Sequence, residues 1–430
     1  MDKMKKNPKK AMWLSLIPGA GQLYNGQKLK GIVLLLITVA FLAELFTVGF
    51  SAVVGLFTLG STPALDNSLF MMIEGVLQLL LIVVMILYVY ASMQDAKKVA
   101  IETNEGQKPN NSVSLMFHNL VETGFPYLLT FPAWILMLFT IVFPVIVTVL
   151  MAFTNYDFLH IPPASLLNWV GFKNFLNIFV LSSYRATFQA VFGWTVIWTL
   201  LASTLQIIIG LATAIIANQD FIKFKRIYGV IFLLPWAIPA FISIMSFSNM
   251  FNDSAGAINV QVLGLLNHIP FVHISAIPWL TNAFWTKTAI IMIQGWLGFP
   301  YIYIMVTGVL QAIPEDLYEA ATLDGATAWQ KFRNITAPTI FTVAAPIFIT
   351  QYTFNFNNFS MIYLFNGGGP GDVGGGAGGT DILISWIYKL TTGQSPQYSI
   401  AAAVTLLISV IVIGISLVVF KKSNSFDLGD

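Results

Sequence analysis

Two stretches of the chain carry amide and aromatic side chains at helical spacing. In QYTFNFNNFSMIY, residues 351–363, the positions i, i+3, i+4 and i+7 are Gln351, Phe354, Asn355 and Asn358, a spacing that places them on one face of a helix. Amide groups donate and accept hydrogen bonds at once, and an aromatic ring can pack against the apolar side of a sugar ring. Because none of these groups is charged, the face suits a neutral, hydroxyl-rich ligand.

The second stretch, QGWLGFPY at residues 294–301, repeats the spacing with Gln294, Leu297, Gly298 and Tyr301. Gly298 would let a ligand or another helix come close. Asn and Gln also hydrogen-bond between membrane helices, for about 0.6–2 kcal/mol, so a single amide would favour that structural reading. Two matching faces on neighbouring apolar segments favour a ligand path instead.

Residue types and motifs that are absent from the sequence limit the functions that are possible. The six later apolar segments contain no Asp, Glu, Lys, Arg or His, whereas ion-coupled carriers place ionisable groups inside the membrane. Glu44 and Glu74, in the first two apolar segments, are interpreted as carboxylates facing another helix or lying near an interface. No phosphate-binding G-x-x-x-x-G-K-[ST] loop occurs, and the absence of cysteine excludes disulfides and thiolate metal sites. The sequence therefore predicts no catalytic residue, metal site or cofactor in this chain.

The elements that must position these residues follow from composition. The chain has 430 residues, is 57% hydrophobic and only 9% charged, whereas soluble domains carry roughly 25% charged residues. Apolar runs of about 20 residues can cross a bilayer as helices. They lie at approximately 31–51, 69–93, 128–152, 187–217, 228–250, 288–311, 339–365 and 398–420. We expect an all-α polytopic membrane protein with about eight transmembrane helices.

Basic residues predict the orientation, because positive charge stays on the cytoplasmic side. One set of alternate loops holds 17 of the 21 Lys and Arg residues, so both termini are expected in the cytoplasm. The 17 are Lys3, Lys5, Lys6, Lys9, Lys10, Lys28, Lys30, Lys97, Lys98, Lys108, Lys223, Lys225, Arg226, Lys331, Arg333, Lys421 and Lys422. Topology and membrane lipid explain this basic excess, and no nucleic-acid partner is expected.

The predicted cytoplasmic loop at 313–338 contains the sequence EAATLDGATAWQKFRNITAP, in which four charged residues fall within twenty. Pro314 suits the first position of a helix, and Gly325 is a plausible left-handed stop. Thr327 and Gln330 have capping-box spacing, and Pro338 is expected to prevent continuation into the next span. The loop is therefore predicted to form two short helices joined by a turn.

A solvated linker is the alternative for this loop. Connections in helical bundles are commonly about two to eight residues long, and this one is much longer. It also shows apolar side chains beside its charges, namely Leu317, Tyr318, Trp329 and Phe332. That combination favours a helix pair that lies along the membrane and fits a partner's groove.

EAATLDGA followed by ITAP resembles the EAA loop of ATP-binding-cassette importer permeases. In that family the loop docks into a cytoplasmic ATPase subunit and transmits its closure. Ala337 departs from the Leu that is usual in the family. The resemblance implies that the coupling residues are Glu319, Ala320, Ala321, Asp324 and Gly325, followed by Ile335 and Pro338 of the second half of the motif.

Residues 187–420 are similar to the larger permease subunit of maltose and maltodextrin importers, through LLPWAIPAFIS at 233–243, GWLGFPY, NFNNF and NGGGP. The resemblance implies that both faces described above line the sugar site. It also implies a basic N-terminus with two extra spans over 1–125, then a six-span permease core over 126–425. Pro235 and Pro239 are predicted to kink the fifth span. PGAGQLYNGQKLKG near the N-terminus is predicted to turn at the interface.

The partners implied are a second homologous permease, two ATPase subunits that bind ATP and Mg, an extracellular sugar-binding protein and an oligosaccharide. The location implied is a bacterial cell membrane. A permease for another oligosaccharide is the nearest alternative. An ion-coupled secondary sugar carrier and a membrane scaffold without transport are more distant ones, because both leave the docking motif unexplained.

Overall fold

The computed structural model describes residues 5–106, 124–219 and 221–422. Lys3 and Lys108, two of the basic residues used above, lie outside this part of the chain. Among the described residues, seven helices are long and apolar enough to cross a membrane, and one bent pair adds an eighth. The prediction of an all-α protein with about eight transmembrane helices is confirmed. Helices satisfy their backbone hydrogen bonds internally, which a span in lipid requires.

The chain divides into two units, Met1–Gly171 and Phe172–Asp430. The first unit contains three of the spans. Its helices are α1 (Pro8–Leu14), α2 (Ala20–Asn25), α3 (Lys28–Glu44), α4 (Phe50–Thr58), α5 (Ser68–Asn104), α7 (Phe125–Met137) and α8 (Phe143–Met151). The π-helical turns Leu45–Gly49 and Leu138–Val142 join α3 to α4 and α7 to α8. The division proposed from sequence, at residue 125, stays a prediction.

The N-terminal PGAGQ segment of the first unit packs against α5. The Gln22 side chain is fully buried, and its Nε2 donates to the Ser92 carbonyl at 3.0 Å and to Asp95 Oδ2 at 3.0 Å. Asp95 in turn pairs with Lys30 at 2.7 Å. The predicted interfacial turn therefore includes a short helix, α2, that these contacts hold on the second span.

The two carboxylates within the first spans have different surroundings. Glu44 Oε2 accepts a hydrogen bond from Gln78 Nε2 of α5 at 3.2 Å, so Glu44 faces another helix as expected. Glu74 is exposed near the start of α5.

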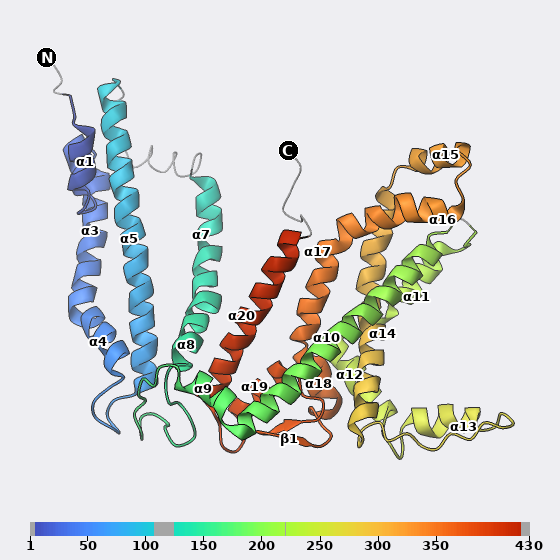
Figure 1. Ribbon diagram of the computed structural model, residues 1–430. Helices are drawn as coiled ribbons and strands as arrows, with labels where there is room; N and C mark the ends of the chain where they lie inside the picture. Colours follow the sequence, from blue (N-terminus) through green and yellow to red (C-terminus); the bar gives the residue numbers. More distant parts are fainter. Residues whose placement is uncertain (1–4, 107–123, 220, 423–430) are drawn as a thin grey trace. The chain divides into compact units, whose positions relative to one another are not determined.

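The second unit contains the other spans and two short strands. Its helices are α9 (Lys173–Val180), α10 (Ser182–Ala217), α11 (Lys225–Ala237), α12 (Ala240–Met250), α13 (Leu263–Leu266), α14 (Ala283–Ala312), α15 (Glu315–Leu323), α16 (Ala328–Lys331), α17 (Ala337–Phe356), α18 (Phe359–Asn366), α19 (Leu383–Thr392) and α20 (Tyr398–Lys422). The π-helical turns Ile258–Val262 and Phe332–Thr336 precede α13 and α17. The strands β1 (Asp372–Gly374) and β2 (Ala377–Gly378) form an antiparallel hairpin. Within this unit, α15 and α16 lie at one end of the spanning helices, and β1 and α19 lie at the other (Figure 1).

The helices α10 and α14 pack along one another in the second unit. A Cβ placed on Gly210 of α10 would lie 2.5 Å from Ile302 Cβ of α14, so a small residue is required for this approach. Phe299, Ile302 and Val306 of α14 belong to a buried cluster that also includes Phe348 of α17. The fifth span bends by 84° between α11 and α12, and this confirms the kink predicted from Pro235 and Pro239.

The helix that begins at α16 corrects one prediction. Pro338 was expected to prevent continuation into the next span, but helix runs from Ala328 to Phe356 through the π-helical turn. The Ala337 N–H donates to the Phe332 carbonyl, five residues earlier. This wider turn shifts the hydrogen-bond register where Pro338 has no N–H to donate. The prediction of a break was therefore wrong.

Candidate functional site

A cavity of about 340 Å³ lies among α10, α11, α14 and α17. Five of the eight predicted ligand-path residues line it, namely Gln294, Gly298, Tyr301, Gln351 and Phe354. The structure adds three lining residues that the sequence reasoning missed, namely Gln206, Trp236 and Thr350.

Three aromatic side chains give the cavity apolar surface. Phe354 is 59% exposed and Trp236 is 51% exposed, and the rings of Trp236 and Tyr301 lie 5.8 Å apart. Exposed aromatic rings offer flat surface for an amphipathic ligand. Sugar rings have such a character, because their C–H faces are apolar while their hydroxyls are polar.

A row of amides lies beside the aromatic side chains. Gln206 Nε2 donates to Gln351 Oε1 at 2.9 Å, and Gln294 Nε2 donates to Gln206 Oε1 at 3.2 Å. Asn358 Nδ2 donates to Gln294 Oε1 at 3.1 Å. These hydrogen bonds connect α10, α14, α17 and the start of α18. Groups of this kind can bind hydroxyls or one another.

Gly298 explains how Gln206 reaches this row. A Cβ at position 298 would lie 2.7 Å from Gln206 Cδ and would overlap Gln206 Oε1. The close approach predicted at Gly298 is therefore made by a side chain of α10.

The remaining three predicted residues do not line the cavity. Asn355 is fully buried, and its Nδ2 donates to Ser203 Oγ of α10 at 3.0 Å. Leu297 packs against a buried cluster around Trp198. Asn358 caps α18, where its Oδ1 accepts from the Met361 N–H at 3.2 Å.

The predicted single face over residues 351–358 therefore needs correction. α17 ends at Phe356, and Asn358 lies beyond it as the N-cap of α18. Asn favours caps because its side chain competes for backbone hydrogen bonds. The i+7 position consequently belongs to a turn, although its amide still joins the row through Gln294.

The loop at 313–338, here called the docking element after its predicted role, forms two helices and a turn. α15 begins at Glu315 with Pro314 as its N-cap, one residue before the position predicted for Pro314. Gly325 has φ +77°, and the Ala326 N–H donates to the Ala321 carbonyl at 2.9 Å. This is the Schellman arrangement that ends helices with a left-handed glycine. The capping box of Thr327 and Gln330 is present.

The surface of the docking element is open. Glu319, Ala320, Asp324 and Gly325 are exposed, and Ala321 is half-buried. Large apolar side chains are exposed beside them, with Leu323 at 90% and Trp329 at 65%. Underneath, Tyr318 Oη and Thr336 Oγ1 lie 2.8 Å apart, joining α15 to the π-helical turn. The element thus presents both charge and apolar surface on a supported backbone.

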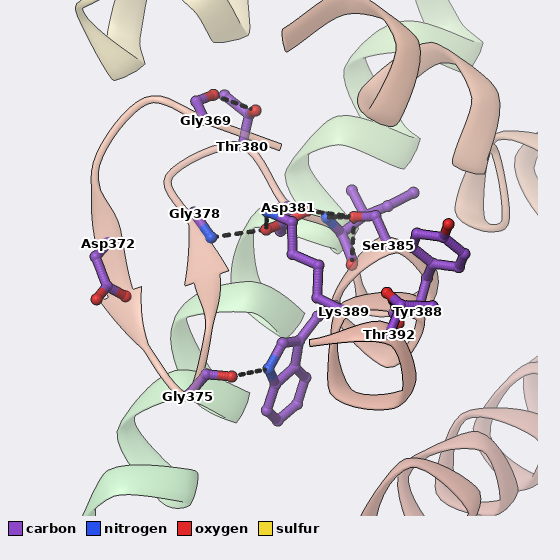
Figure 2. A network of polar contacts seen from close by, with 12 residues as sticks. Gly369, Asp372, Gly375, Gly378, Thr380, Asp381, Ser385, Tyr388, Lys389 and Thr392 are labelled. Atoms are coloured by element: carbon purple, nitrogen blue, oxygen red, sulfur yellow. Dashed lines mark hydrogen bonds and ion pairs between the residues drawn. The ribbon is translucent and has the colours of Figure 1, made fainter. Parts of the chain in front are cut away.

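The glycine-rich hairpin is held by a buried acid at the other end of the unit. Figure 2 shows Asp381 accepting from the Gly378 N–H at 2.6 Å and from Ser385 Oγ at 2.7 Å. Asp381 also forms an ion pair with Lys389. Trp386 Nε1 of α19 donates to the Gly375 carbonyl at 2.9 Å, so α19 also contacts the turn between the two strands.

Comparison with known proteins agrees with these features. Residues 206–424 match the family model described as the binding-protein-dependent transport system inner membrane component. The chain is 63% identical over 421 residues to the maltodextrin transport system permease protein MdxF of Bacillus subtilis (strain 168), with 98% of this chain and 97% of that protein covered. It is 48% identical over 419 residues to the galactooligosaccharides transport system permease protein GanP of the same organism, with 97% and 98% covered.

Among the solved structures that share the fold is one of an ABC transporter. It is the crystal structure of a bacterial ABC transporter involved in the import of the acidic polysaccharide alginate, with a TM-score of 0.58 and 22% identity. The match covers 72% of this chain and 98% of that chain. The family model matches about half of the chain. The two relatives match nearly the whole chain. The chain therefore belongs to the binding-protein-dependent transport system inner membrane components, the permease family of ABC importers.

Proposed function

We propose that this chain is the permease subunit of an ATP-driven importer that carries maltodextrins across a bacterial cell membrane, with both termini in the cytoplasm. The observation that carries the proposal is the 63% identity with MdxF over 98% of the chain. The neutral amides and aromatic rings of the cavity support it, because linear glucans offer hydroxyls and apolar ring faces but no charge.

Energy enters through the docking element. Two ATPase subunits bind ATP and Mg, and one of them engages the exposed helix α15 and the turn at Gly325. The closure of the ATPases then moves the helix 328–356, which starts beside this turn and carries Gln351 and Phe354 into the cavity. A second permease completes the path, and an extracellular binding protein delivers the sugar. This chain itself performs no covalent chemistry.

The eight residues predicted from sequence divide into two roles in this proposal. Gln294, Gly298, Tyr301, Gln351 and Phe354 contact the sugar, because they line the cavity. Leu297, Asn355 and Asn358 position them. Asn358 bonds to Gln294, Asn355 bonds to Ser203 of α10, and Leu297 packs against the buried cluster around Trp198.

A galactooligosaccharide permease is the second candidate, and the 48% identity with GanP favours it over other sugar classes. Uptake of labelled maltotriose distinguishes the two, measured in cells that have or lack this chain while the partner genes are kept. Loss of uptake on deletion, with competition by unlabelled maltotetraose and none by galactooligosaccharide, supports the maltodextrin proposal. Normal uptake on deletion, or stronger competition by galactooligosaccharide, would reject it.

A further inference from the structure

Gln206 of α10 uses both ends of its amide to join two other helices. Its Nε2 donates to Gln351 Oε1 of α17, and its Oε1 accepts from Gln294 Nε2 of α14. The side chain is fully buried, yet it lines the cavity together with these two partners. The amide of Gln206 therefore links α14 and α17 to α10, although these helices are distant in sequence.

The two partners of Gln206 differ in how their helices are held. α14 packs along α10, with Gly298 leaving the room that Gln206 occupies. Gln351 lies on the helix that runs from Ala328 of the docking element to Phe356. This continuous helix therefore connects the docking element to the Gln206–Gln351 hydrogen bond.

We infer that the Gln206–Gln351 hydrogen bond is a latch on the cavity side of the α10–α17 contact, and that it holds until a sugar takes its place. The bond from Asn355 to Ser203 joins the same two helices away from the cavity lining. This inference rests on the proposed importer function and adds a regulatory role for a residue of α10. When no sugar is present, separating the helices leaves two amides without partners in an apolar interior, which is costly. Sugar hydroxyls both donate and accept, so they can satisfy both amides when the helices separate.

Because of the latch, the sugar binds the state with separated helices more tightly than the state with closed helices. A ligand shifts a conformational equilibrium only by as much as it prefers one state over the other. Here the closed state satisfies the amides without sugar, and the open state satisfies them only with sugar. ATP hydrolysis without sugar is consequently suppressed, because the open state needed for the cycle is rarely reached.

The test is the rate of ATP hydrolysis of the complete transporter in lipid nanodiscs, without sugar or binding protein. Gln206→Met keeps the length and packing of the side chain but removes the hydrogen bonds. We expect a rise of about three- to thirtyfold, the range that one interhelical hydrogen bond in a membrane supplies. The bond to Gln294 is also lost, but it lies within the packed pair of α10 and α14, so only the bond to Gln351 is expected to change the rate. Gln351→Met breaks the same bond from α17 and is expected to give a similar rise.

The double variant and a control complete the design. If the two amides act as one bond, Gln206→Met with Gln351→Met raises the rate no more than either change alone. Gln219→Met is the control, because Gln219 is exposed beyond the end of α10 and its Nε2 donates, among the residues that the structure describes, only to the Ile215 carbonyl. Its rate is expected to match that of the unmodified transporter.

Unchanged sugar-free rates in both single variants, or additive effects in the double variant, would overturn the latch. Failure of both single variants to assemble would also overturn it, because a bond that opens in every cycle cannot be essential for assembly. Adding maltotriose with the binding protein tests the sugar separately. Raised sugar-free rates without maltotriose stimulation of the unmodified transporter would keep the latch and reject the maltodextrin assignment.

Discussion

Phe354 is the most exposed aromatic side chain of the cavity, so its removal tests the sugar-binding role at the scale of one residue. Phe354→Ala removes the ring but leaves the amide row intact. Aromatic packing of this kind is worth about 0.5–1.5 kcal/mol, so we expect the apparent KM for maltotriose uptake to rise about two- to twelvefold. The maximal rate should change little, because the lost contact binds substrate and transition state alike.

Phe341→Ala is the matched control for this change. Phe341 lies on the same helix and is similarly exposed, at 56%, but it does not line the cavity. Its KM is expected to stay unchanged. Equal KM values for both variants would contradict the placement of the sugar against Phe354.

Asp66 gives a pH-dependent prediction for the loop between the first two spans. The backbone N–H groups of Ser61 and Thr62 donate to its Oδ2 at 2.7 and 2.9 Å and lower the pKa of this carboxyl. Because the folded loop favours the ionised form, its stabilisation is complete above the ordinary Asp pKa of about 3.9. It is lost as the pH falls through the lower pKa of the folded state.

Hydrogen exchange at the Ser61 and Thr62 amides measures this loss. Protection relative to intrinsic exchange should decrease as the medium is acidified below the ordinary Asp pKa. In Asp66→Asn the side chain cannot ionise, so the protection should no longer depend on pH in this range. A decrease of the same size in both proteins would contradict the role of Asp66.

The cavity residues could be predicted from sequence only where they share a helix. Gln294, Tyr301, Gln351 and Phe354 follow helical spacing in uncharged stretches, which local pattern reveals. Gln206 lies alone in the apolar sequence TLQIIIG, and a single amide within a span is its only local signal. Its role depends on the approach of α10 to Gly298, which is a tertiary contact that spacing along one helix does not contain.

At the scale of elements, the turn between α15 and α16 depends on Gly325. With φ +77°, this position is left-handed, which costs a residue with a Cβ roughly 1–2 kcal/mol. Gly325→Val should distort the Schellman turn and reduce the ATPase subunit that co-purifies with the chain. Gly308→Val is a suitable control, since Gly308 has an ordinary φ and open space around a Cβ. Unreduced co-purification of the Gly325 variant would contradict the docking role of this turn.

The hairpin of β1 and β2 depends on Asp381, a buried acid that lies just before α19. Asp381→Ala removes the acceptor for Gly378 and the ion-pair partner of Lys389 (Figure 2). Breaking a buried ion pair from one side costs about 3–5 kcal/mol, and the partial exposure of Lys389 places the expected cost at or below the lower end. Limited proteolysis should then cleave the glycine-rich segment faster.

Asp372→Ala is the control for the hairpin. Asp372 is exposed, and within the described part of the chain its side chain accepts only from the nearby Gly374 N–H, at 2.7 Å. Its cleavage rate should change much less. Equal rates for the two variants would show that Asp381 does not hold the hairpin.

The caps of the docking element could be predicted from the sequence, but the continuation of its second helix into α17 could not. Gly325, Thr327 and Gln330 act through bonds within a few residues, and the structure confirms each of them. Pro338 was interpreted as a break because proline removes a donor from a regular helix. The π-helical turn at Phe332–Thr336 accommodates that loss, and such a turn is not evident from proline and glycine positions alone.

At the scale of the whole molecule, the spans follow directly from the apolar runs, and the fifth was even expected to kink. Orientation, partners and cargo require other information. The basic loops predict cytoplasmic termini by the positive-inside rule, and the docking motif predicts an ATPase partner. The relatives then favour maltodextrin as cargo. The central claim of this account is that transport draws its energy from ATP hydrolysed by a partner. The sequence favours this over ion coupling, because no Asp, Glu, Lys, Arg or His lies in the six later apolar runs.

The most direct test of this account is accumulation of labelled maltotriose in proteoliposomes that contain the complete transporter, with the binding protein outside. We predict accumulation when ATP and Mg are enclosed and none when ATP is absent. An ionophore that dissipates proton and sodium gradients should leave the accumulation unchanged. Accumulation that proceeds without ATP and collapses with the ionophore would contradict the account and identify an ion-coupled carrier.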